Sequence, residues 1–384
     1  VRSITEHSRQ PLLAIITTLG RELIAESLEP GFKGKIFISS SSEIEIADIS
    51  IGETVALKIL GFTRGGYRGA LLERVASSSV LEQAIVTSLK VHGVPCSWPR
   101  ELQRSLESLP VEVTDAEVDD RIDLSSIPFV TIDGDSAKDF DDAVYAELLE
   151  DASWKLMVAI ADVSHYVRVG GEIDKEAKLR GTSVYFPDTV IPMLPEELSN
   201  ELCSLKAGNR RLVLVCEVLL NAEGDVVSYH FFEAAIRSHA RLIYEDVQSY
   251  YSQQHFTEKL SGQVKASLDN LYTLYGLLQK RRVDRGALDF PENSASIELK
   301  NGSVTRINPD KRTEAHKLIE EMMILANVCA ASFLNEQRQP GLYRNHEAPD
   351  ILKLEQLRQS LTTIGVSFRK ENIVPKDMQE LLAR

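Results

Sequence analysis

Short apolar runs separated by turn residues make up the first part of the chain. Four of them are rich in β-forming residues: Leu12–Leu19, Lys35–Ile38, Thr54–Phe62 and Gly69–Val75. Runs of this length that are bounded by Gly, Pro and Ser are typical of strands. About five such strands within residues 1–78 predict a small β-barrel of the OB-fold type.

A helical pattern follows the β-rich part. Val80–His92 has apolar residues at helical spacing, prolines interrupt the next stretch, and the acidic segment Thr114–Asp123 is expected to be exposed. We therefore interpret residues 79–124 as a helical linker.

From Ser125 onward, strand-like and helical runs alternate. The strand-like runs are Lys155–Ala161, Leu212–Leu220 and Val226–Ala235, and the helical runs are Leu268–Arg282 and His316–Leu334. This alternation predicts a mixed α/β domain over residues 125–384. We expect an α+β protein in which a barrel precedes this larger domain.

Composition narrows the class of protein. The 384 residues are 43% hydrophobic, which is enough for a sizeable core. The net charge of -14 argues against a general polyanion-coating protein, but it does not exclude local basic patches. The four cysteines lie far apart without a C-x-x-C pair, as in a reducing compartment. We find no leader pattern and no apolar run long enough to span a bilayer, so we expect a cytoplasmic protein without membrane contact.

The most unusual stretch is Asp133–Asp142, which contains five aspartates in ten residues. The apolar runs Ile127–Ile132 and Ala143–Ala146 flank it and resemble buried strands. Crowded carboxylates raise each other's pKa unless a cation lies among them. Ligation by oxygen alone favours Mg²⁺, with Mn²⁺ as the alternative.

Several kinds of site can contain such a loop. Two metal ions roughly 4 Å apart would support in-line phosphoryl displacement. An EF-hand needs Glu at its twelfth position, where this chain has Val144 or Ala146, depending on whether the loop starts at Asp133 or Asp135. A solvated acidic loop and a carboxylate pair for glycoside hydrolysis remain as alternatives. His165 is a lone histidine beside a strand-like run, and we expect it to be structural.

Several separated blocks resemble one known family. They are Thr131–Tyr145, Val158–Val167, Arg180–Pro187, Ile191–Leu205, Leu318–Asn327 and Leu342–Glu347. In this order they are similar to the RNB catalytic domain of the ribonuclease II / ribonuclease R exoribonucleases, and closest to the ribonuclease R branch. Residues 1–78 resemble the cold-shock-type OB domain that precedes this catalytic domain in the family.

The resemblance implies processive 3′→5′ hydrolysis of single-stranded or structured RNA to nucleoside 5′-monophosphates, with Mg²⁺. The four family aspartates fall on Asp133, Asp139, Asp141 and Asp142. All four are expected metal ligands, and Asp141 and Asp142 are the expected catalytic residues. In the family, the aspartate matching Asp141 is the one whose loss damages catalysis most. Asp135 is not among the four.

The resemblance also implies residues that contact RNA. Tyr185 matches a tyrosine that stacks on the terminal bases, and Phe290 matches a phenylalanine that clamps the same end, although both could instead be core aromatics. One of Glu320 and Glu321 matches a glutamate near the terminal ribose, and we favour Glu321.

Basic residues give weaker signals. Arg64, Tyr67 and Arg68 flank a Gly-Gly turn, which is either a base-stacking loop or an ordinary hairpin. Four further arginines could line the path of the RNA or be merely solvated: Arg180, Arg210, Arg211 and Arg282.

The match also has gaps. The family's later block, of the F-T-S-P-I-R-R-Y type, has no counterpart before Arg384, and its arginine neutralises charge on the phosphate. We therefore expect a catalytic domain that is incomplete at its C-terminus and poorly active as this chain alone. An RNA-binding fragment or pseudo-enzyme that keeps the fold without activity is the alternative reading. A different metal-dependent phosphohydrolase is a more distant one.

Overall fold

The computed structural model describes residues 11–20, 22–28, 32–40, 44–75, 80–253, 260–288, 295–300, 303–309, 312–343, 347, 349–368 and 373–382. Contacts divide the chain into two units. The first comprises Val1–Ser105, Glu172–Met193 and Ala295–Pro309, and the second comprises Leu106–Gly171, Leu194–Ser294 and Asp310–Arg384. Each unit is described by itself. The domain boundaries near residues 78 and 124 stay predictions.

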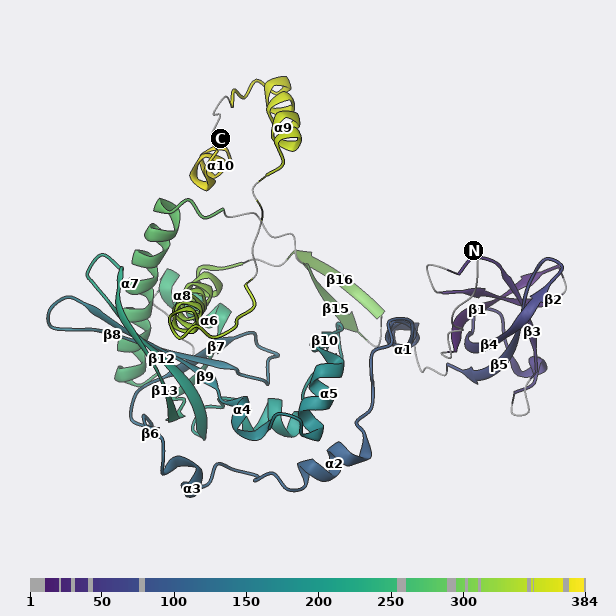
Figure 1. Cartoon of the computed structure of the whole chain (residues 1–384), viewed down its shortest axis with the longest axis horizontal. Helices are drawn as coiled ribbons and strands as arrows, with labels where there is room; N and C mark the ends of the chain where they lie inside the picture. Colours follow the sequence, from purple (N-terminus) through teal and green to yellow (C-terminus); the bar gives the residue numbers. More distant parts are fainter. Residues whose placement is uncertain are drawn as a thin grey trace. The chain divides into compact units, whose positions relative to one another are not determined.

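The first unit begins with a closed barrel of five strands, in the order β1-β2-β3-β5-β4 (Figure 1). The strands are β1 (Leu12–Leu19), β2 (Glu22–Ser27), β3 (Lys35–Ser39), β4 (Thr54–Thr63) and β5 (Gly66–Arg74). Alternate residues such as Ala14, Ile16 and Leu57 point inward and are buried, as the strand period requires. The predicted barrel is thus confirmed, and β2 is the strand that the apolar pattern did not reveal.

The turn between β4 and β5 needs its two glycines for different reasons. Gly65 has φ +112°, a conformation that side chains disfavour. A Cβ on Gly66 would collide with the carbonyl oxygen of Lys35 in β3. This close approach lets β3 and β5 pair in parallel from Ile36 and Tyr67 onward.

The remaining elements of the first unit are short. The helical ones are the 3-10 turn η1 (Ile46–Asp48), α1 (Val80–Val91), α2 (Arg100–Leu106) and α5 (Glu172–Arg180). Two hairpins complete the unit: β10 (Val184–Tyr185) pairs with β11 (Val190–Ile191), and β15 (Ala295–Lys300) pairs with β16 (Ser303–Pro309). Helix α1 confirms the helical spacing seen in Val80–His92.

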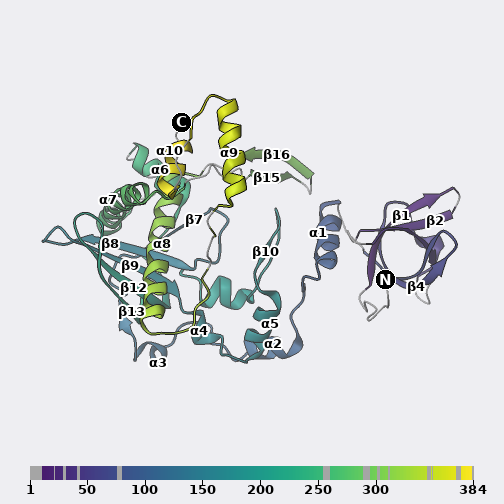
Figure 2. The ribbon, with the colours of Figure 1, turned by 45° about the horizontal axis from the view of Figure 1, so that its top comes forward.

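The second unit is built on a mixed sheet of seven strands in the order β14-β7-β8-β9-β12-β13-β6 (Figure 2). The strands are β6 (Ile122–Asp123), β7 (Val130–Asp133), β8 (Asp142–Leu148), β9 (Trp154–Ala161), β12 (Arg210–Leu220), β13 (Val226–Arg237) and β14 (Ala240–Ile243). The strands predicted on both sides of the aspartate stretch are confirmed as β7 and β8.

Helices α6 (Tyr244–Gln253), α7 (Gly262–Asp284) and α8 (Glu314–Glu336) of the second unit contact this sheet. Other helical elements of the unit are α3 (Asp115–Val118), α4 (Val163–Tyr166), the π-helical turn η2 (Glu197–Leu202), α9 (Ile351–Thr363) and α10 (Pro375–Leu382). Leu271 of α7 and Met322 of α8 share one buried cluster with Val158 and Val218 of the sheet. Helices α7 and α8 therefore supply the core layer over one sheet face.

One expectation needs correction, and another needs a small qualification. Helix α8 is long and apolar enough to cross a membrane by length and composition alone, contrary to the sequence analysis. Its buried residues, among them Leu318 and Met322, contribute to the sheet core, which explains the apolar composition. The acidic segment Thr114–Asp123 is mostly exposed, as expected, and the exceptions include Glu117 and Arg121, whose side chains form ion pairs with His165 and Asp162.

Candidate active site

The aspartate loop joins two neighbouring strands of the seven-stranded sheet. Asp133 is the last residue of β7, and Asp142 is the first residue of β8. The Gly134 amide donates to Asp133 Oδ1 over 2.7 Å. The Ala161 amide of β9 donates to the backbone oxygen of Asp141 over 2.9 Å. The sheet therefore fixes both ends of the loop and returns the later carboxylates toward the first.

The carboxylates interact electrostatically, as the sequence predicts. Burial raises the pKa of Asp133, Asp141 and Asp142, and the neighbouring aspartates raise each of them further. The charge of Asp139 raises the pKa of both Asp133 and Asp141. Asp142 shows the largest effect, because burial, then Asp133 and Asp141, raise its pKa to about 6. The loop thus concentrates negative charge, which the positive charges of Arg241 and His316 offset only in part at Asp133.

A hard cation fits this group of aspartates by chemistry. The Oδ2 atom of Asp142 is buried and has no hydrogen-bond partner, and a buried carboxylate oxygen of this kind is costly unless it has a ligand. All the donors are carboxylate oxygens, which suit Mg²⁺ or Mn²⁺. Within the described ranges, no three acidic, His or Cys side chains already form a metal-binding group.

Asp142 makes a testable contribution to the pH dependence of stability. Since its pKa is raised from 3.8 to about 6, the folded protein binds this proton more tightly than the unfolded chain does. In metal-free protein, this tighter proton binding makes its full contribution to the stability of the folded state below about pH 4. The contribution is lost as the pH rises through about 6. At roughly 1.4 kcal/mol per pKa unit, Asp142→Asn should gain about 2–3 kcal/mol over wild type at pH 7.

The measurement is urea unfolding in EDTA at pH 4 and pH 7. The gain of Asp142→Asn over wild type should be small at pH 4 and should appear at pH 7. Asp135→Asn is the matched control, because the Asp135 side chain in the same loop is 85% exposed. An equal gain at both pH values would show that Asp142 ionises normally.

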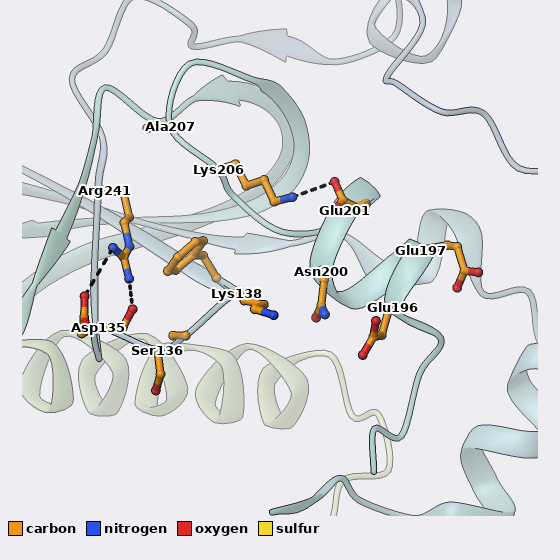
Figure 3. Close-up of a pocket in the computed structure, with 12 residues that line it drawn as sticks. Asp135, Ser136, Lys138, Glu196, Glu197, Asn200, Glu201, Lys206, Ala207 and Arg241 are labelled. Atoms are coloured by element: carbon orange, nitrogen blue, oxygen red, sulfur yellow. Dashed lines mark hydrogen bonds and ion pairs between the residues drawn. The ribbon is translucent and has the colours of Figure 1, made fainter. Parts of the chain in front are cut away.

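Arg241 of β14 holds the first turn of the loop. Its guanidinium donates to the backbone oxygen of Asp135 over 2.5 Å and to that of Gly134 over 3.3 Å. Figure 3 shows the Arg241 side chain pointing toward Asp135 at the edge of an open cavity of about 940 Å³. Lys138 and Phe140 of the loop, together with η2 residues such as Asn200, line the same cavity. The cavity therefore borders the outer part of the loop, from Asp135 to Lys138 and at Phe140, and none of the four candidate aspartates lines it.

Two aromatic residues next to the aspartates escaped the sequence analysis. Tyr244 follows β14, whose Ile243 pairs with Asp133. Its ring stacks on His316 with 3.8 Å between centroids. Burial raises the pKa of Tyr244, and the charges of Asp133 and Asp142 raise it further. Their positions became visible only once β14 was paired with β7.

The two candidate glutamates on α8 point to different surroundings. Glu320 pairs with Arg312 and shares the electrostatic environment of Tyr244 and His316, close to the aspartates. Glu321 is buried and accepts a 2.7 Å hydrogen bond from Arg282 of α7. The geometry therefore favours Glu320, and not the predicted Glu321, as the residue on the aspartate side.

Arg180 has a complete set of partners in the first unit. Its guanidinium bonds to Glu176 at 3.0 Å, to the backbone oxygens of Ser97 and Pro192, and lies 3.6 Å from the Trp98 ring centroid. Only 3% of its side chain is exposed. These contacts give Arg180 a structural role, and its contact with RNA stays a prediction.

The other predicted RNA contacts differ in accessibility. The Tyr185 side chain in β10 is exposed. On the barrel, Tyr67 packs beside Phe62 with 4.7 Å between centroids, and Arg64 is exposed. Phe290 lies outside the described residues. Tyr185, Tyr67 and Arg64 thus remain candidates for stacking or phosphate contacts.

Three arginines of the second unit are already engaged. Arg210 pairs with Asp115, and Arg282 pairs with Glu321. Arg211 is buried and donates to the backbone oxygens of Ser204 and Arg210. His165 binds Glu117 over 3.0 Å beside Arg121, which fits the structural role expected for it.

Comparison with known proteins decides the family. Residues 121–384, more than half of the chain, match the family model of the RNB domain. The chain belongs to the RNB domain family. RNB relatives include ribonuclease R of Escherichia coli, which is 41% identical over 317 residues and covers 82% of this chain and 39% of the relative. Ribonuclease R of Thermotoga maritima is 40% identical over 293 residues, or 76% of this chain and 41% of the relative. The chain spans about two fifths of the length of these relatives.

Solved RNB structures share the fold. Mycoplasma genitalium RNase R in complex with double-stranded RNA has a TM-score of 0.89 at 25% identity, covering 100% of this chain and 68% of that one. Yeast Ssd1, described as a pseudonuclease, has a TM-score of 0.71 at 15% identity, covering 99% and 47%. The RNB resemblance and the mixed α/β fold with its five-stranded barrel are confirmed. The roles of individual residues stay predictions.

Proposed function

We propose that this RNB protein is a hydrolytic 3′→5′ exoribonuclease that degrades single-stranded or structured RNA processively to nucleoside 5′-monophosphates. The observation that carries the proposal is the β7–β8 loop, where the charges of Asp133, Asp139, Asp141 and Asp142 act on one another and three of these carboxylates are partly or largely buried. Crowded carboxylates of this kind suit metal-assisted phosphodiester hydrolysis.

The four aspartates would hold Mg²⁺, with Mn²⁺ as a substitute, and no organic cofactor is required. A divalent cation held there would make a water molecule more acidic and would offset the negative charge of the phosphate. Asp142, with a raised pKa and an unpartnered oxygen, is suited to ligation. To Asp141, whose backbone oxygen accepts from the Ala161 amide of β9, we assign the role of orienting the attacking water. Attack at phosphorus with departure of the preceding O3′ leaves a nucleoside 5′-monophosphate.

RNA is the proposed partner, with its single-stranded 3′ end at the aspartates. Solved structures of Mycoplasma genitalium RNase R contain double-stranded RNA and ribose-methylated single-stranded RNA. Exposed Tyr185 and the barrel residues Tyr67 and Arg64 offer stacking and phosphate contacts, and Phe290 is proposed to clamp the terminal bases. A glutamate of α8 would accept a bond from the 2′-hydroxyl, which distinguishes RNA from DNA. We place the reaction in the cytoplasm.

The test is a nuclease assay on the natural full-length protein with Mg²⁺. Single-stranded RNA labelled at its 3′ end should release labelled nucleoside 5′-monophosphate from the start of the reaction. The same RNA labelled at its 5′ end should release label only in the last stage. DNA of the same sequence, and RNA in EDTA, should stay intact.

Each alternative has its own outcome in this assay. Tight RNA binding without product would favour a pseudo-enzyme, the class to which yeast Ssd1 is assigned. Internal fragments from both labelled RNAs would indicate an endonuclease. Early release of the 5′ label would reverse the proposed direction.

A further inference from the structure

Ser204 lies against the middle of the aspartate loop, although it belongs to the segment after η2. It is completely buried. Its Oγ donates to the backbone oxygen of Lys138 over 2.7 Å and accepts from the Phe140 amide over 3.1 Å. Asp139 is the residue between these two backbone groups. The Ser204 hydroxyl therefore bridges the two backbone groups on either side of Asp139.

The residues on both sides of Ser204 also lie next to the aspartate loop. The Leu205 amide donates to the backbone oxygen of Phe140 over 2.9 Å. Burial raises the pKa of the Cys203 thiol to about 12, and the charge of Asp141 contributes. The segment from Cys203 to Leu205 thus runs along the loop up to Asp141.

Arg211 ties this segment to the sheet. Its Nε donates to the backbone oxygen of Ser204 over 2.8 Å, and its Nη1 donates to that of Arg210 over 2.9 Å. Arg211 is a residue of β12, so Ser204 is held by a strand of the central sheet. The position of the hydroxyl is therefore determined from outside the loop.

The chemistry of the site requires a hydroxyl. The loop presents one carbonyl oxygen and one amide to the same buried atom, and a hydroxyl can donate and accept at once. Alanine would leave both backbone groups unpaired in a buried position. Bulk solvent does not reach the Ser204 side chain, which is completely buried.

We propose that Ser204 is a positioning residue, whose hydroxyl fixes the backbone from Lys138 to Phe140 so that Asp139 and Asp141 present their carboxylates to a divalent cation. This inference rests on the proposed function. Ser204 touches neither the cation nor RNA and acts only through the loop backbone. Loop residues that ligate metals commonly depend on such outer hydrogen bonds.

The test compares Ser204→Ala, Ser204→Cys and Ser238→Ala in the natural full-length protein. Ser238 is the matched control, because it is also buried and its Oγ donates to a backbone oxygen, that of Ala240. Mn²⁺ binding is measured by titration calorimetry, and amide hydrogen exchange is measured at Phe140. Mononucleotide release is measured against Mg²⁺ concentration.

We expect Ser204→Ala to bind Mn²⁺ about 10-fold more weakly, with a similar increase in the Mg²⁺ concentration for half-maximal activity. The Phe140 amide should exchange faster, and saturating Mg²⁺ should restore most of the activity. Ser204→Cys, which keeps a weak donor and acceptor, should fall between alanine and wild type. Ser238→Ala should match wild type in Mn²⁺ binding.

Three results would overturn the inference. They are wild-type Mn²⁺ affinity in Ser204→Ala, an equal loss in Ser238→Ala, and an alanine-like or worse defect in Ser204→Cys despite normal folding. If Ser204→Ala fails to fold, the cysteine variant decides alone. A wild-type protein that binds Mn²⁺ and RNA without releasing nucleotide would overturn the proposed function instead. In that case, the comparison of Mn²⁺ affinities between wild type and the Ser204 variants would still test whether Ser204 positions the loop.

Discussion

Asp141→Asn should reduce mononucleotide release by more than about 100-fold while RNA binding is retained. Changing an outer partner of a metal ligand already costs 10–100-fold, so losing a ligand charge should cost more. The loop geometry adds a reason specific to Asp141, since the bond from the Ala161 amide fixes its backbone. Its side chain lies in the field of Asp133 and Asp139. Asparagine keeps the shape but removes the charge that balances the cation.

The measurement is the release of 3′-labelled nucleotide by the full-length protein, with RNA binding followed in parallel by filter retention. Asp135→Asn is the matched control in the same loop. The Asp135 side chain is 85% exposed, and its contribution to the Arg241 contact comes mainly from the backbone oxygen. Near-normal release is expected from this control. Equal release by wild type and Asp141→Asn would show that the aspartate roles are wrongly assigned.

Arg121→Met should lower the free energy of unfolding by about 3 kcal/mol. The Arg121 guanidinium contacts Asp162 over 2.6 Å, and the two side chains are only 5% and 9% exposed. Removing one partner of a buried pair leaves the other charge without compensation. Asp162 also caps α4 through the His165 amide. The loss should therefore loosen the junction between α4 and the chain that precedes β6.

Urea unfolding at pH 7 measures this effect, and Arg210→Met is the control. Arg210 pairs with Asp115, whose side chain is 91% exposed, so its loss should cost no more than about 1 kcal/mol. A second variant, Arg121→Met with Asp162→Leu, should recover part of the stability because no buried charge is left unpaired. Equal losses in Arg121→Met and Arg210→Met would contradict the importance of burial.

The α8 glutamates show where local reasoning reaches its limit. Helical geometry correctly implied that adjacent Glu320 and Glu321 face different ways. Which of them faces the aspartates depends on the rotation of α8 about its axis. Packing of Leu318 and Met322 against the sheet sets that rotation, and it turns Glu321 toward Arg282 of α7. No local pattern in the sequence contains this information.

The arginines show that local sequence also does not reveal which charged side chains are available to a ligand. As exposed cations, Arg180 and Arg211 would be natural RNA contacts. Tertiary structure buries both among backbone oxygens that need donors. An arginine's availability to a ligand is decided by acceptors far away in sequence, such as Ser97 for Arg180.

The sequence by itself determined the barrel, the mixed α/β domain and the crowded aspartates between two strands. These features are local, because alternation and turn residues specify strands, and carboxylates within one short loop lie close enough for their charges to interact. Tertiary structure alone decided what surrounds the loop. Tyr244, Arg241 and Ser204 come from later segments, and they reach the aspartates because β14 pairs with β7 and the chain after η2 follows the loop. Such contacts arise from the order of strands in the sheet, which apolar periodicity does not encode.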